Sequence, residues 1–288
     1  MWPLDPIADA ALDALRARDA ALREEHAVYG LDVLDELSFH PLIAAGLAAS
    51  GVGVLREQPY PHEWFRKLRP GKSGLDLPIL RDRMRCDLVL TPAPNQKLDD
   101  SLLNEKRRRA DAIELQGTLF ESLSQSHLAP GAVVDGFASV TPPRSDVAEP
   151  KASPPRHPAS LPSSTLPLHT SVPPESVFWL ELKLVGQFCN TSGLPGPNRT
   201  YTSELTRNPI ADLKKLADDD RIHHAGVLLI VFTADEQTAK HDLNVLAHRC
   251  MDRNLPIPLG GPITRSFPIP DRIGNTVCTM CLIGLRKG

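Results

Sequence analysis

A proline- and serine-rich stretch separates this 288-residue chain into two parts. Ten of the 28 prolines lie within residues 141–175, and this stretch contains no aromatic residue. Such a composition buries too little apolar surface to offset the entropy lost on ordering, so we predict a disordered linker here. The parts on either side are then expected to form one domain with an insertion. We predict a first half at 1–95, a helical arm and linker at 96–176, and a second half at 177–288.

Composition excludes several classes of protein. The chain has 32 basic and 35 acidic residues, a net charge of −3, which excludes a wholly basic, histone-like binder. It lacks the run of roughly 18 apolar residues that a membrane span requires, and its first ten residues carry two acids and no base. We therefore expect a cytoplasmic protein. An odd number of scattered cysteines argues against a disulfide framework: Cys86, Cys189, Cys250, Cys278 and Cys281.

The apolar pattern predicts an α/β fold, a central mixed sheet flanked by helices. One helix is expected to start with Asp5 as N-cap and Pro6 as first helical residue, and others at 34–49, 209–217 and 236–252. A further helical pattern, at 96–127, predicts the inserted arm. Strands are predicted at 52–57, 85–91, 177–185, 225–233 and 277–285.

Three charged residues stand on strands that are otherwise apolar. Glu181 and Lys183 are two positions apart and emerge on the same face, about 6 to 7 Å from each other. Asp87 lies on an earlier apolar strand. Charged groups in such places are costly unless they are paired or bind a metal. If the two strands are neighbours, the two acids can converge on one cation, with Lys183 beside it.

This pattern resembles the PD-(D/E)XK nuclease superfamily, whose signature is an acid on one strand and acid-x-Lys on the next. Here it reads Asp87 and then Glu181-Leu182-Lys183, with Cys86 in place of the usual proline. An acid on a preceding helix also fits, at Glu36, as does the polar helix sequence DLKKL after the second strand. The resemblance implies a restriction-endonuclease-like core.

The same resemblance implies metal-dependent hydrolysis of phosphodiesters. Asp87 and Glu181 would hold Mg²⁺ or Mn²⁺, with Glu36 completing the site directly or through water. Lys183 would orient or help to deprotonate the attacking water, and Gln187 is a candidate for positioning water or phosphate. A plain ion pair between Glu181 and Lys183 is the structural alternative.

A basic region supports a nucleic-acid substrate, with DNA favoured over RNA. Residues 56–85 contain eight basic and four acidic residues with interleaved aromatics, typical of a surface that follows a phosphate backbone, although a solvated loop would look the same. An inactive nuclease-like scaffold that recruits a protein through the proline-rich stretch, and an unrelated α/β enzyme, remain alternatives; a homodimer stays open. The candidates for phosphate contacts are Arg66, Lys67, Arg69, Lys72 and Lys215.

Overall fold

The computed structural model describes residues 2–61, 85–99, 170–191 and 193–286. It divides the chain into two compact units, 1–103 with 169–288 and 104–168, and the second unit lies outside the described residues. Chain segments from both sides of the proline-rich stretch therefore form the first unit. None of the helices within the described ranges is long and apolar enough to cross a membrane.

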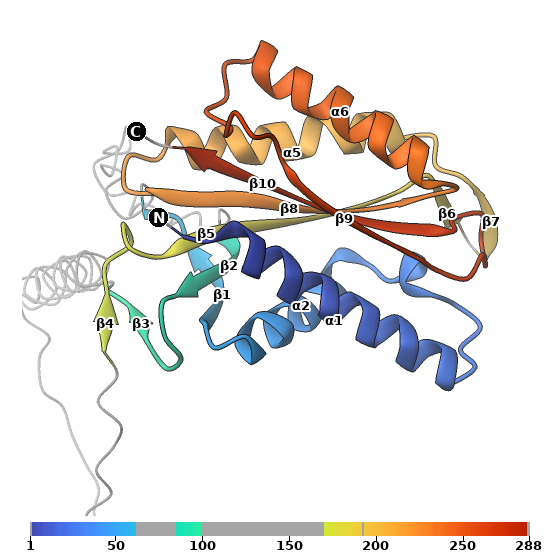
Figure 1. The fold of residues 1–288 in the computed structure, drawn as a ribbon, viewed down its shortest axis with the longest axis horizontal. Coiled ribbons are helices and arrows are strands. Elements are labelled where there is room, and N and C mark those ends of the chain that lie inside the picture. The colour runs from blue at the N-terminus through green and yellow to red at the C-terminus, as the bar shows by residue number, and fades with distance from the viewer. Residues whose placement is uncertain (1, 62–84, 100–169, 192, 287–288) are drawn as a thin grey trace, which may run out of the picture. The chain divides into compact units, whose positions relative to one another are not determined.

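A six-stranded mixed sheet forms the centre of this unit (Figure 1). The strand order is β1-β2-β5-β8-β10-β9, in which β5 and β8 run parallel and every other neighbouring pair runs antiparallel. The central strand β8 is buried along nearly its whole length, as its continuous apolar sequence predicts. The six strands are β1 (Gly53–Pro59), β2 (Arg85–Thr91), β5 (Phe178–Gly186), β8 (His224–Thr233), β9 (Ile263–Pro268) and β10 (Val277–Arg286).

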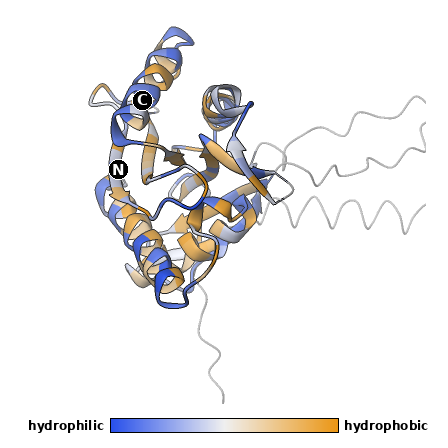
Figure 2. Ribbon diagram, turned by 90° about the vertical axis from the view of Figure 1, so that its right-hand side faces the viewer, coloured by the Kyte–Doolittle hydropathy of each residue, from blue (hydrophilic) through white to orange (hydrophobic). Residues whose placement is uncertain are grey.

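Two pairs of helices cover the two faces of the sheet (Figure 1). α1 (Leu4–Glu24) and α2 (Glu36–Ala49), joined by the short 3-10 helix η1 (Leu31–Val33), cover one face. α5 (Tyr201–Asp218) and α6 (Glu236–Asp252) cover the other. Figure 2 shows hydrophobic and hydrophilic residues alternating along the helices around a mainly hydrophobic sheet, so one apolar core fills each side.

Most predicted elements are confirmed, with shifts at their ends. The helix predicted at 236–252 begins and ends as expected, because Asp235 caps it by accepting the Thr238 backbone N–H. The α5 prediction is too short: the helix begins at Tyr201, and Pro209 lies inside it. α1 begins at Leu4 without a side-chain cap, so the predicted Asp5 cap is wrong. β9 was not predicted.

Two short strand pairs lie outside the main sheet. β6 (Phe188–Thr191) and β7 (Leu194–Pro197) form a hairpin after β5. β3 (Lys97–Leu98) pairs in parallel with β4 (Ser171–Val172), so the predicted arm does not start as a helix at 96 and the predicted linker does not extend to 175. The rest of the predicted arm and the linker up to 169 lie outside the described residues.

Candidate active site

Neighbouring strands bring two of the predicted acids together. β2 and β5 pair antiparallel, with Leu88 opposite Leu180. The same register carried one step further places Asp87 opposite Glu181. The regular ladder stops there, because a carboxylate oxygen of Asp87 accepts the backbone N–H of Leu182 at 2.7 Å. The adjacency that the site prediction required is therefore present.

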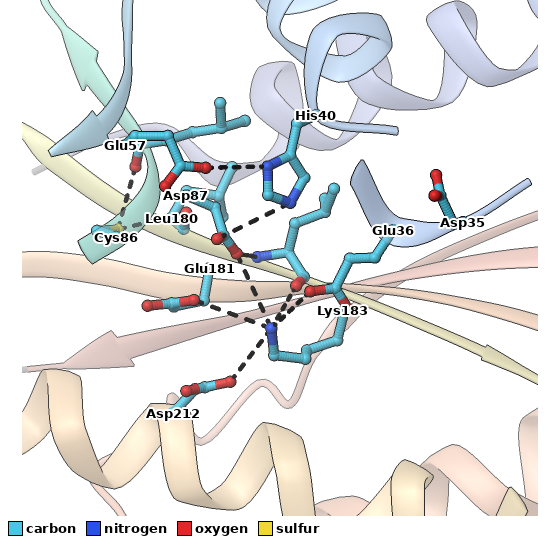
Figure 3. A network of polar contacts seen from close by, with 12 residues as sticks. Asp35, Glu36, His40, Glu57, Cys86, Asp87, Leu180, Glu181, Lys183 and Asp212 are labelled. Atoms are coloured by element: carbon cyan, nitrogen blue, oxygen red, sulfur yellow. Dashed lines mark hydrogen bonds and ion pairs between the residues drawn. The ribbon is translucent and has the colours of Figure 1, made fainter. Parts of the chain in front are cut away.

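The Lys183 ammonium lies among four carboxylates contributed by four different elements (Figure 3). Its Nζ atom is 3.1 Å from Glu36 on α2, 3.6 Å from Asp212 on α5, 3.9 Å from Asp87 on β2 and 4.0 Å from Glu181 on β5. The side chain of Lys183 is only 17% exposed. Segments far apart in the sequence thus converge on one largely buried cationic group.

A second lysine neutralises Glu181, the most deeply buried acid of the group. The Lys215 Nζ atom lies 2.9 Å from one Glu181 oxygen and 3.1 Å from Asp212, its neighbour one turn earlier on α5. The Tyr60 hydroxyl donates to the same Glu181 oxygen, and the Lys215 ammonium sits 4.6 Å from the centre of the Tyr60 ring. The Glu181 carboxylate is therefore held in place by two hydrogen-bond donors, the Lys215 ammonium and the Tyr60 hydroxyl.

A histidine occupies the opposite side of Asp87. His40 lies on α2 one turn after Glu36, and its side chain is 3% exposed. Its Nε2 atom is 3.8 Å from Asp87 Oδ1, and its Nδ1 atom is 3.5 Å from Glu57 Oε1 on β1 (Figure 3). Neither ring nitrogen makes a hydrogen bond with any residue that the structure describes. A buried imidazole without a hydrogen-bond partner is costly, so this side of the site favours a further ligand.

Burial and charge shift the pKa values of this cluster in a consistent way. Burial alone would lower the pKa of Lys183, but the surrounding carboxylates, Glu36 foremost, raise it above its usual value. Lys215 behaves likewise: Glu181 and Asp212 outweigh its burial and raise its pKa. Burial raises the pKa of Glu181, and the Lys215 charge opposes this effect. Both lysines therefore carry a proton at neutral pH and act as hydrogen-bond donors.

The residues present fit a divalent cation. When the four acids around Lys183 are ionised, the two ammonium groups leave two negative charges uncompensated. Glu36, His40 and Asp87 each offer one ligand atom, and these atoms lie within 4.8 Å of one another. The expected ligand set of Asp87, Glu181 and Glu36 thus differs from this cluster, because Glu181 faces Lys215.

The other predicted residues lie elsewhere. The Gln187 side chain accepts the Ala234 backbone N–H at 2.9 Å, beyond the end of β5, and it is not among the groups around Lys183. Lys215, a candidate for phosphate contacts, is engaged by two carboxylates within the cluster. The remaining candidates for phosphate contacts lie outside the described residues: Arg66, Lys67, Arg69 and Lys72.

Three residues of the cluster were not predicted as site residues. His40 follows Glu36 by four positions on a helix, a spacing that places both on one face and could have identified it. Asp212 belongs to the polar DLKKL sequence, which was noted only as a family feature. Glu57 carries no local signal, because its part in the site depends on how β1 packs against α2.

No protein-family model, curated protein or solved structure matches this chain.

Proposed function

We propose that this protein is a metal-dependent nuclease that hydrolyses phosphodiester bonds, with DNA as the favoured substrate. The observation that carries the proposal is the convergence of Glu36, Asp87 and Glu181 on the Lys183 ammonium, from one helix and two adjacent strands. The acid-x-Lys spacing on β5 and the arrangement of α2 before the sheet agree with a restriction-endonuclease-like core.

In this proposal, Glu36 and Asp87 would hold Mg²⁺ or Mn²⁺, and Glu181, which faces Lys215, would help to hold the Lys183 ammonium in place. The cation supplies a bound water of lowered pKa and offsets charge on the phosphate. Lys183 keeps its proton and donates hydrogen bonds, so its part is to orient the water or a phosphate oxygen. Asp212 and Lys215 fix the Lys183 ammonium and the Glu181 carboxylate from α5.

A second candidate function is an inactive binding module that keeps this fold. The observation that favours it is the closed ion-pair network, in which Lys183 and Lys215 already contact every acid around them. Such a network also serves as a structural element without substrate. Catalysis distinguishes the two functions.

The test is plasmid cleavage with Mg²⁺ or Mn²⁺, comparing the parent with Lys183→Ala. Removing one positioned group of this kind reduces rates by about 10²- to 10⁴-fold, and we expect a loss of this size. Lys214→Ala is the matched control, because Lys214 is an exposed neighbour of Lys215 on α5. This variant should cleave at the parental rate.

Circular dichroism and melting curves establish that each variant is folded, and EDTA establishes the dependence on metal. Equal cleavage by the parent and Lys183→Ala would contradict the assigned role. If the folded parent cleaved neither DNA nor RNA with either metal, the binding module would be the better account.

A further inference from the structure

Glu57 has a backbone conformation that its residue type disfavours. Its φ is +53°, in the left-handed region where residues other than glycine, asparagine and aspartate are uncommon. It lies within β1, and its neighbours pair normally with β2: Arg56 with Leu88, and Gln58 with Cys86. The distortion is therefore confined to the one position that stands opposite Asp87. Strain of this kind is costly and clusters at active sites and ligand-binding sites.

The strand β2 is also irregular next to this position. Cys86 and Val89 both belong to the core on the α5 and α6 side, although three positions of a regular strand would place them on opposite faces. The pleat is thus interrupted between them, at Asp87. A local break in β1 and β2 accompanies the approach of the Asp87 and Glu57 carboxylates to one imidazole.

That imidazole has a carboxylate at each ring nitrogen. Glu57 lies 3.5 Å from Nδ1 of His40, and Asp87 lies 3.8 Å from Nε2. The ring is buried and makes no hydrogen bond within the described part of the chain. Nε2 is on the side of Asp87, which together with Glu36 and His40 forms the cluster of possible metal ligands.

We propose that Glu57 is a positioning residue, whose carboxylate accepts a hydrogen bond from the Nδ1–H of His40. This bond leaves Nε2 unprotonated and directs it toward Glu36 and Asp87, where it serves as the third ligand of a transition-metal ion such as Mn²⁺. This inference rests on the proposed metal-dependent function. Metal-ligating histidines commonly donate their second ring N–H to a carboxylate, which fixes the tautomer and strengthens the ligand.

The ligand set also selects the ion. Mg²⁺ takes oxygen ligands almost without exception, whereas imidazole nitrogen suits first-row transition metals. The ligand atoms lie within 4.8 Å of one another, so they must move inward to share an ion at bond lengths of about 2.0 to 2.3 Å. Mn²⁺, a transition metal that accepts both carboxylate oxygen and imidazole nitrogen, is therefore expected to bind more tightly than Mg²⁺.

The first experiment measures Mn²⁺ and Mg²⁺ binding to the full chain by calorimetry, and records pulsed electron paramagnetic resonance of the Mn²⁺-loaded protein. A ligating imidazole gives a nitrogen hyperfine signal, which we expect in the parent and not in His40→Gln. Bound Mn²⁺ without nitrogen coupling would overturn the inference and leave the nuclease proposal intact. Absence of Mn²⁺ and Mg²⁺ binding at millimolar concentrations would overturn both.

The second experiment isolates Glu57. Glu57→Gly removes the carboxylate while tolerating the positive φ, so the metal-free melting temperature should not fall. Loss of such an outer partner typically lowers metal affinity about 10- to 100-fold, and we expect this loss in Glu57→Gly. Glu57→Gln keeps an amide oxygen that can accept the Nδ1–H, so its loss should be smaller. Glu25→Gln, which removes an exposed carboxylate paired with Arg18, is the matched control and should bind like the parent.

Parental Mn²⁺ affinity in both Glu57 variants would overturn the positioning role. These readouts do not depend on cleavage. A protein that shows the nitrogen coupling but cleaves no nucleic acid would therefore support this inference while contradicting the proposed function.

Discussion

Lys183 and Asp32 are two largely buried ionisable residues, and they differ in how well their surroundings compensate their charge. The Lys183 ammonium has four carboxylates within 4.0 Å, so its positive charge is well compensated. In turn, the ammonium reduces the repulsion among these carboxylates. Asp32, in the 3-10 helix η1, has one oxygen bound by the Asn275 side chain, and its other oxygen, Oδ1, has no hydrogen bond among the described residues. Burial is the main reason why the pKa of Asp32 is raised.

The raised pKa of Asp32 makes stability depend on pH. Because the folded state holds the proton more tightly than the unfolded chain, this group's contribution is fully present below its usual pKa of 3.8 and is lost as pH rises through the raised value. Asp32→Asn should therefore raise the melting temperature at neutral pH, and the gain should vanish below about pH 4. The measurement is a series of melting curves against pH. Asp220→Asn, at an exposed position, should show no such trend, and a gain independent of pH would contradict the argument.

At the scale of elements, α2 carries two of the residues around Asp87 on its first turns. Asp35 caps this helix, with Oδ1 accepting the Ser38 backbone N–H at 2.9 Å, directly before Glu36. The same arrangement begins α6, where Asp235 accepts the Thr238 backbone N–H at 2.7 Å. The hydrogen bonds from Ser38 and Thr238 lower the pKa of each capping carboxyl. The two caps are thus chemically alike, but only one adjoins the site.

Replacing each cap separates helix stability from the function of the site. Asp35→Ala and Asp235→Ala should both lower the melting temperature at neutral pH, because each leaves N–H groups of a first helical turn without an acceptor. The loss should shrink as pH falls through the lowered pKa values, where the parental caps become protonated. Only Asp35→Ala should also weaken Mn²⁺ binding in calorimetry. Equal weakening by both variants would show that general destabilisation is the cause.

Strands and helices with strong local signals could be predicted, and elements without them could not. β8 and β10 are continuous apolar runs, and their predicted ends agree with the structure within one residue. β9 contains Arg265 and Ser266 and lies at the sheet edge, where apolar alternation is weak. α5 was predicted to begin at Pro209, a residue type that favours a first helical turn, whereas here it stands within the helix.

The site could be predicted only in part, for a related reason. Spacing along β5 is enough to place Glu181 and Lys183 on one face. The contact of His40 with Glu57 depends on the packing of α2 on β1. The left-handed backbone of Glu57 could not be predicted either, because glutamate does not favour a positive φ. Residues that meet through tertiary packing therefore stay hidden from spacing arguments.

At the scale of the whole molecule, one sheet is assembled from chain segments on both sides of residues 104–168. All residues of the cluster around Lys183 belong to the unit formed by 1–103 and 169–288. The C-terminal part of the predicted linker contributes to this unit. The Pro174 carbonyl accepts the buried Trp179 indole N–H, and Glu175 pairs with Arg221 at 3.1 Å.

This division predicts that residues 104–168 can be replaced by a short Gly/Ser linker without loss of the fold. Asp99 directly follows β3 and Thr170 directly precedes β4. Because these two strands pair in parallel, the two residues are about 10 Å apart, roughly the length of two to three residues of a strand. About eight Gly/Ser residues, with a mean span of roughly 16 Å, bridge this distance. The melting temperature and Mn²⁺ affinity should then remain close to those of the parent.

Extending the deletion to residue 175 provides the matched comparison. It removes β4 and leaves the buried Trp179 indole N–H without its acceptor, at a cost of about 1–3 kcal/mol. For a domain of this size we expect the melting temperature to fall by roughly 2 to 12 °C. Both variants are compared with the parent by calorimetric melting. Unfolding of the shorter deletion would show that residues 104–168 stabilise the sheet, and equal stability of the two deletions would contradict the structural role of β4.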